Sequence, residues 1–251
     1  TQIGNCYQVP VAQIEESFRP RDRGTVLAGV LNGLEDGEDC VSVILMPNND
    51  LLNEPDLFFF TKRGMVKRSL FSEYAVRRSK VAAIGLAKND SVIGVTTLKS
   101  QDDIYCLSKS GMLIRFAVDE VSATGRVTRG VIGMRLAPKD RLIAAGGIQN
   151  SDMLLLISER GYMKRVPGNM IDSQRRAGKG VHSFYFNKNG NNGTYIAASF
   201  TSDLPRSFTV LTTQGQAVPF NTEDIALQKL NERGKPYVMA VLDDVVCDVI
   251  L

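Results

Sequence analysis

A short motif that recurs five times along the chain limits what it can fold into. The motif is a threonine or serine, two variable residues and a glycine, and its successive glycines are 60, 47, 50 and 54 residues apart. Apolar, β-prone residues follow every copy and precede the last four. This is the pattern of a β-hairpin whose turn glycine takes a positive φ. The copies begin at Thr1, Thr61, Ser108, Ser158 and Thr212.

A second glycine follows most of the hairpins at a nearly constant distance. It lies 19 residues after the hairpin glycine in the last three copies and 20 residues after it in the first, while Lys80 holds the matching place in the second copy. An apolar run such as TVLAGVL and an acidic or Asn-rich turn come next. Each unit thus has about four strand-like segments over about 50 residues, the size of a propeller blade. Helical periodicity is brief, near residues 11–16 and 222–229.

These features predict an all-β, five-bladed, propeller-like fold that forms one domain over residues 1–251. The alternative is an unrelated β-sandwich whose hairpins resemble one another by chance. Five aligned copies that share two glycine positions make this alternative less favourable. Because one blade cannot bury both of its faces, neighbouring blades should share a core. The chain begins on the first hairpin motif, so we expect the leading strand of that blade to come from elsewhere in a longer polypeptide. The expected repeats span approximately 1–56, 57–103, 104–152, 153–206 and 207–251.

Charge is segregated along the chain although the net charge is only +3. Residues 62–80 hold seven Lys or Arg against one acid, and residues 160–180 hold six against one. Residues 35–56 hold seven acids and no base. Such segregation lets one surface attract a polyanion while the molecule stays nearly neutral.

Four segments resemble a known family. The hairpins FFFTKRGMVKR and LLLISERGYMKR and the segments GRVTRGVIGMRL and SQRRAGKGVHSF are similar to the C-terminal domain of the A subunits of DNA gyrase and topoisomerase IV, the bacterial type IIA topoisomerases. The resemblance covers essentially the whole chain. It implies a β-pinwheel, a propeller relative whose blades exchange strands and whose rim binds bent duplex DNA. It also implies partners and chemistry outside this chain: an upstream cleavage domain with a tyrosine and Mg²⁺, and an ATP-binding B subunit in an A2B2 enzyme.

Within that family the sequence favours topoisomerase IV over gyrase. DNA wrapping by gyrase depends on a QRRGGRG motif in its first blade, whereas the nearest match here, residues 174–180, lies in the fourth repeat and has Ala177 in place of a glycine. The opening GNCYQVPVAQIEESFRPRDRG and the segment RRSK at 77–80 resemble topoisomerase IV A subunits. We therefore expect a non-catalytic DNA-binding domain that directs relaxation and decatenation. The alternatives are the wrapping domain of gyrase and, in another class, a propeller that binds an acidic protein.

Basic residues recur at two places in the repeats and form the candidate DNA site. They occupy the third and fourth positions after the hairpin glycine and the loop before the second landmark. Recurrence in register favours a binding track over isolated solvated charges, because a protein that follows duplex DNA needs Lys and Arg along one surface. We expect the track to cross the three middle repeats, with the first and fifth peripheral. The candidates are Lys67, Arg68, Arg77, Arg78, Lys80, Arg115, Arg126, Arg129, Lys164, Arg165, Arg175, Arg176 and Lys179.

The sequence predicts no catalytic, nucleotide or metal site in this chain. No serine or cysteine arrangement points to His182, the one histidine. There is no GxxxxGK[ST] loop, and the acids show no metal-ligand spacing. The four cysteines form no CxxC pair and are expected to be free thiols. No apolar run approaches the roughly 18–20 residues of a membrane helix, so we expect a soluble intracellular protein that is not in a membrane. The family resemblance implies a bacterial cytoplasmic protein that associates with the chromosome.

Overall fold

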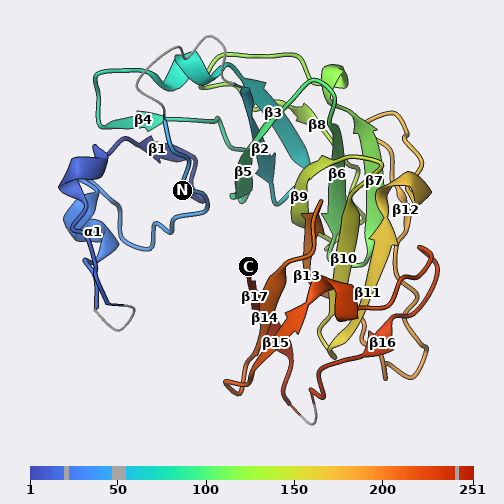
Figure 1. Ribbon diagram of the computed structural model, residues 1–251. Coiled ribbons are helices and arrows are strands. Elements are labelled where there is room, and N and C mark those ends of the chain that lie inside the picture. The colour runs from blue at the N-terminus through green and yellow to red at the C-terminus, as the bar shows by residue number, and fades with distance from the viewer. Residues whose placement is uncertain (20–22, 47–54, 241–242) are drawn as a thin grey trace.

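The sheets of the molecule follow one another around an arc in chain order (Figure 1). The structure, a computed structural model, describes residues 1–19, 23–46, 55–240 and 243–251. Within these ranges the regular structure is almost entirely antiparallel β-strand, as predicted. The inner strands of neighbouring sheets contact one another around the axis of the arc.

Three of the five sheets have four strands each, in the order inner strand, hairpin and outer strand. The first contains β5 (Val92–Leu98), β2 (Asp56–Thr61), β3 (Met65–Ser69) and β8 (Val131–Ile132). The second contains β9 (Leu142–Ile148), β6 (Asp103–Ser108), β7 (Met112–Ala117) and β12 (Val181–His182). The third contains β13 (Ile196–Ser202), β10 (Met153–Ser158), β11 (Tyr162–Pro167) and β16 (Lys235–Pro236).

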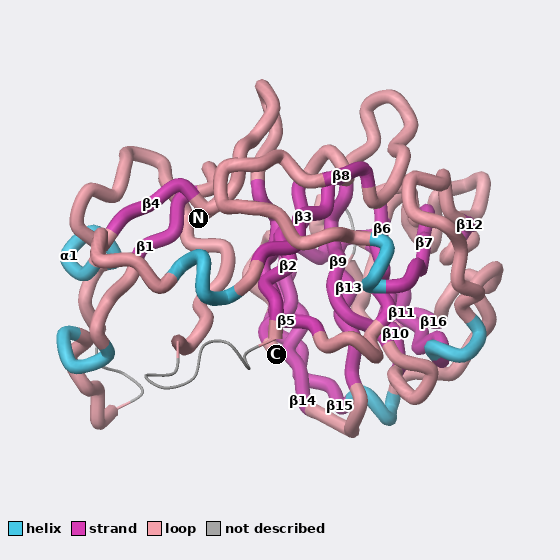
Figure 2. Tube along the Cα trace, turned by 90° about the horizontal axis from the view of Figure 1, so that it is seen from above, coloured by secondary structure: helices cyan, strands magenta, loops and turns pink. Residues whose placement is uncertain are grey.

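The two remaining sheets are smaller. At one end, β1 (Asn5–Tyr7) pairs with β4 (Lys80–Ala82). At the other, β14 (Ser207–Thr212) pairs with β15 (Ala217–Asn221) and β17 (Val246–Ile250). Figure 2 shows the β1–β4 sheet set apart from the others, beside α1 (Leu27–Val30).

The outer strand of each four-stranded sheet comes from the following repeat. β8 follows β7 in the chain but pairs with β3, so that Val131 lies opposite Val66. In the same way β12 pairs with β7 and β16 with β11. This exchange identifies the architecture as the pinwheel form of a propeller.

Both glycine landmarks are explained by this exchange. Gly64, with φ +82°, ends the turn of the first complete hairpin, and its carbonyl oxygen accepts hydrogen bonds from the backbone of Gly133 and Met134. A β-carbon at position 64 would lie 2.5 Å from the carbonyl oxygen of Met134. The second landmark, Gly130, has φ +76°, and a β-carbon there would overlap the carbonyl oxygen of Val66. Each glycine therefore permits a close approach of two repeats.

The hydroxyl residue of the motif also has a defined partner. Asp90, just before β5, accepts hydrogen bonds from the Thr61 hydroxyl at 2.8 Å and from the backbone of Arg63 at 2.9 Å. In the last repeat Asp244 accepts from the hydroxyl of Thr213, the residue after the motif threonine, and from the backbone of Gln214.

Asp140 does the same for Ser110, so that an acid before the inner strand caps the hairpin turn in the second, third and fifth repeats. In the fourth repeat the direction is reversed, because Glu159 of the hairpin turn accepts hydrogen bonds from the backbone of Thr194 and Tyr195.

The hydrophobic core lies between neighbouring sheets. One cluster joins Phe58, Phe60 and Val66 to Ile104 and Phe116 of the next repeat. Similar clusters join the third repeat to the fourth and the fourth to the fifth. Complete burial of each such side chain stabilises by roughly 1.5–3 kcal/mol, so adjacent repeats stabilise each other.

Helical structure is limited to single turns. The stretches predicted near 11–16 and 222–229 contain the 3₁₀ turns η1 (Val11–Gln13) and η5 (Thr222–Asp224). Equivalent turns are η2 (Phe71–Tyr74), η3 (Val118–Glu120) and η4 (Gly168–Met170). The prediction of a strand in the run TVLAGVL is wrong, because residues Leu27–Val30 of this run form α1. No helix in the described ranges is long and apolar enough to span a membrane.

Candidate nucleic-acid interface

The lysines at the third position after the hairpin glycine point into the protein. Lys67 has no exposed surface, and its Nζ donates to the Ser69 hydroxyl at 2.6 Å, the Ala83 carbonyl at 2.9 Å and the Tyr74 hydroxyl at 3.1 Å. Burial lowers its pKa to about 8, an effect that the charge of Glu73 opposes. Lys67 therefore links β3 to η2 and to Ala83. Ala83 directly follows β4, the strand that the second repeat supplies to the sheet of the first.

Lys164 is buried in an equivalent place and has a different partner set. Its Nζ donates to the backbone carbonyls of Lys229, Leu230 and Glu232, each at 2.8 Å, and lies 5.1 Å from the centre of the Phe184 ring. Burial lowers its pKa to about 7, against the attraction of Glu232. Its ammonium group therefore anchors the loop that leads to the outer strand β16.

The arginines at the fourth position hold the 3₁₀ turn of the next repeat. Arg115 pairs with Asp103 at 2.7 Å, and its Nη1 donates to the Gly168 carbonyl at 2.7 Å. Two further arginines make the corresponding contacts. Arg68 pairs with Asp56 at 2.5 Å and donates to the Val121 carbonyl, and Arg165 donates to the carbonyls of Ile225 and Glu223.

The recurrence of these bases therefore has a structural cause, because each repeat needs the same contact with the next one. Lys67 and Lys164 are fully buried and Arg115 is 7% exposed, so the structure does not place them where a duplex could reach their charges. Arg68 and Arg165 are half-buried and partnered. The sequence pattern alone does not separate a binding residue from a residue that joins repeats.

Two arginines of the exchanged loops are partly buried, and one of them is held by hydrogen bonds. Arg176 donates from its backbone N–H to the Glu120 carboxylate at 3.1 Å, and from its guanidinium to the carbonyls of Glu120 and Ile132 at 3.1 and 3.2 Å. Arg126 is half-buried, and its Nη1 is shielded from solvent without a hydrogen-bond partner among the described residues.

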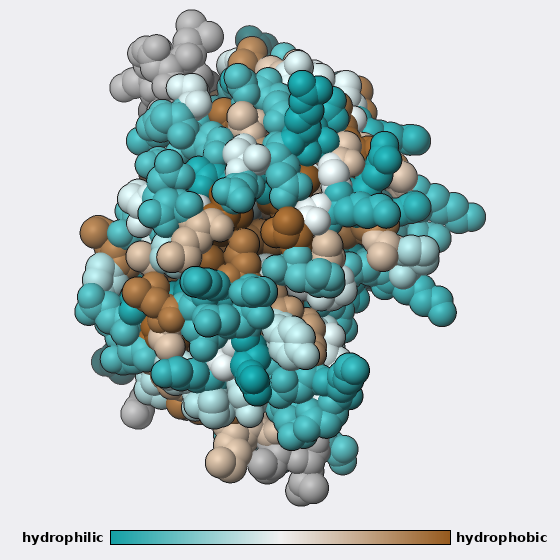
Figure 3. All heavy atoms as spheres, turned by 90° about the vertical axis from the view of Figure 1, so that its right-hand side faces the viewer, coloured by the Kyte–Doolittle hydropathy of each residue, from teal (hydrophilic) through white to brown (hydrophobic). Residues whose placement is uncertain are grey.

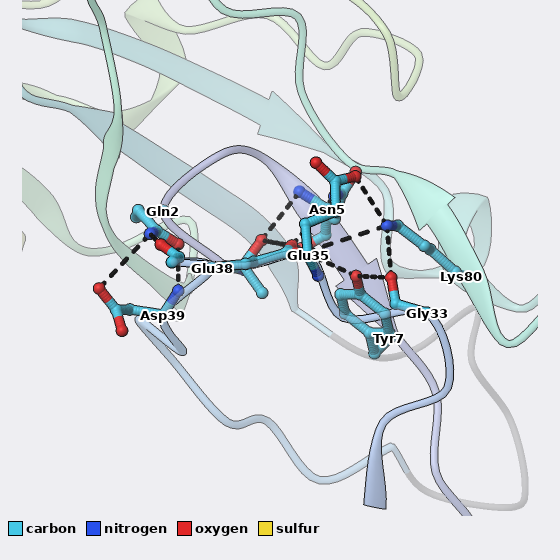
Figure 4. A network of polar contacts seen from close by, with 10 residues as sticks. Gln2, Asn5, Tyr7, Gly33, Glu35, Glu38, Asp39 and Lys80 are labelled. Carbon is cyan, nitrogen blue, oxygen red and sulfur yellow. Dashed lines mark hydrogen bonds and ion pairs between the residues drawn. The ribbon is translucent and has the colours of Figure 1, made fainter. Parts of the chain in front are cut away.

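Lys80 lies under an acidic turn of the first repeat. Its Nζ contacts Glu35 at 2.9 Å, the Gly33 carbonyl at 2.8 Å and Glu38 at 3.9 Å (Figure 4). A hydrogen bond with Tyr7 and the contact with Glu35 raise its pKa above the usual range. This lysine is therefore already neutralised within the protein.

Glu38 is the centre of the same network (Figure 4). Its carboxylate accepts hydrogen bonds from Thr1 at 2.5 Å, Tyr7 at 2.7 Å and Asn5 at 3.0 Å, and from the backbone of Glu35. Burial would raise its pKa, but these hydrogen bonds lower it to about 2. Glu38 thus caps the first hairpin turn as Asp90 caps the second.

The remaining candidates are exposed. Their side chains make no hydrogen bond or ion pair within the described part of the chain, and they all lie on the loops that lead to exchanged strands. Those loops lie on the outer side of the arc, and one side of this rim is covered largely by hydrophilic side chains, with hydrophobic ones near its middle (Figure 3). The exposed candidates are Arg77, Arg78, Arg129, Arg175 and Lys179.

Three exposed basic residues of the fifth repeat were not among the candidates: Lys229, Arg233 and Lys235. Alignment of the repeats on the second glycine would have shown Arg233 in the place of Arg129 and Lys179. Glu232 lies beside Arg233 and near Lys235 in the sequence, so the sequence alone is equally consistent with an ion pair inside the protein.

Titratable groups give no sign of a metal centre in the described residues, since no three His, Cys, Asp or Glu side chains are grouped to hold an ion. His182 is exposed on β12, at the outer rim.

The exchanged strands and the exposed bases define the class of this protein as a β-pinwheel with a basic outer rim. The family model described as DNA gyrase C-terminal domain, beta-propeller, matches residues 55–99, 102–146 and 152–191, more than half of the chain. The chain belongs to this family, that of the C-terminal domains of type IIA topoisomerase A subunits, as the resemblance in its sequence implied.

Individual proteins agree with the family match. The DNA gyrase A subunit of Chlamydia pneumoniae is 28% identical over 237 residues, which cover 93% of this chain and 28% of the relative. The DNA gyrase A subunit of Deinococcus deserti is 31% identical over 243 residues, covering 93% of this chain and 29% of the relative. The chain thus spans less than a third of the length of these relatives.

Solved structures match the fold. The crystal structure of the C-terminal domain of DNA topoisomerase IV has a TM-score of 0.89 and 22% identity, covering 99% of this chain and 76% of that one. The structure of the DNA gyrase A C-terminal domain has a TM-score of 0.69 and 23% identity, covering 80% of this chain and 66% of that one.

Proposed function

We propose that this chain binds duplex DNA along its outer rim, mainly through phosphate contacts. The observation that carries the proposal is the set of exposed, unpartnered bases on successive exchanged loops within the described ranges, Arg129 on the third repeat and Arg175 and Lys179 on the fourth, with Arg77 and Arg78 on the second. Lys and Arg in such positions attract closely spaced phosphates and carry little sequence information. Binding should therefore tolerate different DNA sequences.

We further propose that the chain serves a bacterial type IIA topoisomerase as its non-catalytic DNA-binding part. The parent enzyme would cleave DNA with a tyrosine and Mg²⁺ in an upstream domain of the same chain. It would bind ATP on a B subunit in an A2B2 assembly and act on the chromosome in the cytoplasm. Support for this comes from the family match and from the curated relatives, which are gyrase A subunits.

Topoisomerase IV is the parent that we favour, so the rim would direct relaxation and decatenation. The higher TM-score to a topoisomerase IV domain and the position of the gyrase-like segment in the fourth repeat support this choice. The curated relatives support gyrase as the alternative. Closing nicked circular DNA with ligase in the presence of the chain separates the two: a chiral wrap would change the linking number, and a topoisomerase IV-like rim would leave it nearly unchanged.

A salt titration with random-sequence duplex DNA tests the binding itself. The logarithm of the binding constant should fall with the logarithm of salt by about 0.9 per phosphate neutralised. The variant Arg129→Gln/Arg175→Gln/Lys179→Gln should bind more weakly and with a shallower slope. Absence of binding at low salt would exclude the proposal. Binding of polyglutamate in preference to DNA would support the alternative, an acidic protein partner.

A further inference from the structure

The loop of the fifth repeat has the same backbone arrangement as the loop of the fourth. The backbone N–H of Gln228 donates to the Arg165 carbonyl at 2.9 Å, just as Gln174 donates to the Arg115 carbonyl at 2.7 Å. Gly234 has φ +74° and Gly180 has φ +75°. The residue before the glycine is Arg233 in one loop and Lys179 in the other, so these two bases hold one structural position.

The bases of the fifth-repeat loop are not neutralised by their acidic neighbour. Glu232 directs its carboxylate to the backbone N–H of Lys229 at 2.8 Å, and its carbonyl accepts from Lys164. No ion pair joins it to Arg233 or Lys235 in the described part of the chain, and both side chains are exposed.

The loop is also held rigidly before any ligand arrives. Lys164 binds three of its carbonyls, and Asn192, which has no exposed surface, donates to the Arg233 carbonyl at 3.1 Å. The backbone N–H of Gly234 donates to the Gln228 side chain at 2.8 Å. A preformed loop loses little conformational entropy when its bases meet phosphates.

The opposite end of the rim, near the first repeat, carries acidic side chains. Position 79, which matches Arg129, Lys179 and Arg233, is a serine, and the neighbouring Lys80 is paired with Glu35. Asp36 and Asp39 are exposed beside it. Beyond Arg77 and Arg78, phosphates at this end of the rim would therefore face acids.

We propose that the phosphate-binding rim extends through the fifth repeat, with Arg233, Lys235 and Lys229 as its outermost contacts, and that the acidic turn at Glu35–Asp39 bounds it at the first repeat. This inference rests on the proposed function, because it places a duplex DNA backbone on the same rim. It moves the centre of the track from the second, third and fourth repeats to the third, fourth and fifth.

The test compares two double variants of the chain in salt titrations with random duplex DNA. Arg233→Gln/Lys235→Gln should lower the salt slope by about 1.8, at about 0.9 per contact, and weaken binding on the order of tenfold or more near 0.1 M salt. The control, Lys99→Gln/Arg206→Gln, removes the same charge from exposed positions in the loops between inner strands and hairpins, and should change binding less than twofold.

A conservative variant separates charge from folding. Arg233→Lys/Lys235→Arg should restore the affinity and slope of the parent chain, and thermal unfolding should be the same for all variants. Equal loss of binding in the test and control variants would overturn the fifth-repeat site and leave the proposed function standing. Failure of the parent chain itself to bind DNA would overturn both.

Discussion

The α-carbon of Gly161 lies directly against the carbonyl group of Val238, so that a β-carbon at position 161 would overlap the Val238 oxygen. The Gly161 carbonyl accepts hydrogen bonds from the backbone of Tyr237 and Val238 at 3.1 and 3.2 Å. Val238 follows the outer strand β16, so this contact between a hairpin turn and an exchanged segment joins the fourth repeat to the fifth.

Replacement of Gly161 by alanine should therefore weaken the contact between the fourth and fifth repeats and lower the stability of the protein. The residue has φ +75°, which costs an L-residue about 1–2 kcal/mol, and the overlap adds about 1–3 kcal/mol. We expect Gly161→Ala to lower the free energy of unfolding by about 2–5 kcal/mol in a urea titration. Gly125→Ala is the control, because a β-carbon at position 125 meets nothing within 4 Å. Similar losses in both variants would contradict this account.

The buried lysines should differ in their importance for stability. Lys164→Met would leave the Leu230 carbonyl without its donor, and a buried polar group left unsatisfied costs about 1–3 kcal/mol. The Lys229 and Glu232 carbonyls would keep the backbone N–H groups of Glu232 and Tyr185, at 3.2 and 3.1 Å. In Lys67→Met the Ala83 carbonyl would keep its hydrogen bond from Tyr74 at 3.0 Å. We expect the first variant to be destabilised by about 1–3 kcal/mol and the second by less, in parallel urea titrations. The reverse order would contradict the assignment of Lys164 as the anchor of the fifth-repeat loop.

Periodicity was enough to predict the fold, but it does not distinguish a basic residue on the surface from one that holds two repeats together. The glycines were recognisable because a positive φ and a close backbone approach leave glycine as the suitable residue, as at Gly64. A lysine such as Lys164 suits a buried cage of carbonyls as well as a phosphate, so its recurrence is ambiguous. Whether such a lysine is buried, and what it contacts, depends on which repeat supplies the outer strand. These contacts join residues about 65 positions apart in the sequence, such as Lys164 and Lys229, and the local pattern does not show them.

Ala177 is strained where the gyrase-like motif has a glycine. It has φ +63°, a left-handed conformation that disfavours side chains, and its backbone N–H is fixed by the Gly133 carbonyl at 2.7 Å. We expect Ala177→Gly to be as stable as the parent or more stable by up to about 1 kcal/mol, since relief of strain offsets the entropy gained by the unfolded chain. Ala177→Val should be destabilised, because a β-branched residue fits this conformation poorly. If Ala177→Gly unfolded at a lower temperature than the parent chain, the backbone at Ala177 would not be strained.

Glu38 should make the first repeat sensitive to acid. Because its pKa is lowered to about 2 in the folded protein, its contribution to stability is complete above its ordinary pKa of 4.5 and is lost as pH falls toward 2. The free energy of unfolding of the parent chain should decrease over this range by about 2 kcal/mol more than that of Glu38→Gln. The measurement is urea unfolding between pH 2 and 6, with fluorescence of a probe on the exposed thiol of Cys40, close in sequence to Glu38, in proteins that carry Cys247→Ser. Parallel pH profiles for the two proteins would exclude this role.

The acidic turn should weaken DNA binding at its end of the rim. Glu35→Gln/Asp36→Asn removes the shorter ion pair of Lys80 and two charges that repel phosphates, and leaves the lysine with the 3.9 Å contact to Glu38 as its ion pair. We expect tighter binding by severalfold at low salt and a salt slope steeper by up to about 0.9. Asp203→Asn/Asp248→Asn makes the same change in net charge at exposed positions near the inner strands and serves as control. If both variants gained affinity equally, the effect would arise from net charge, and the acidic turn would not bound the track.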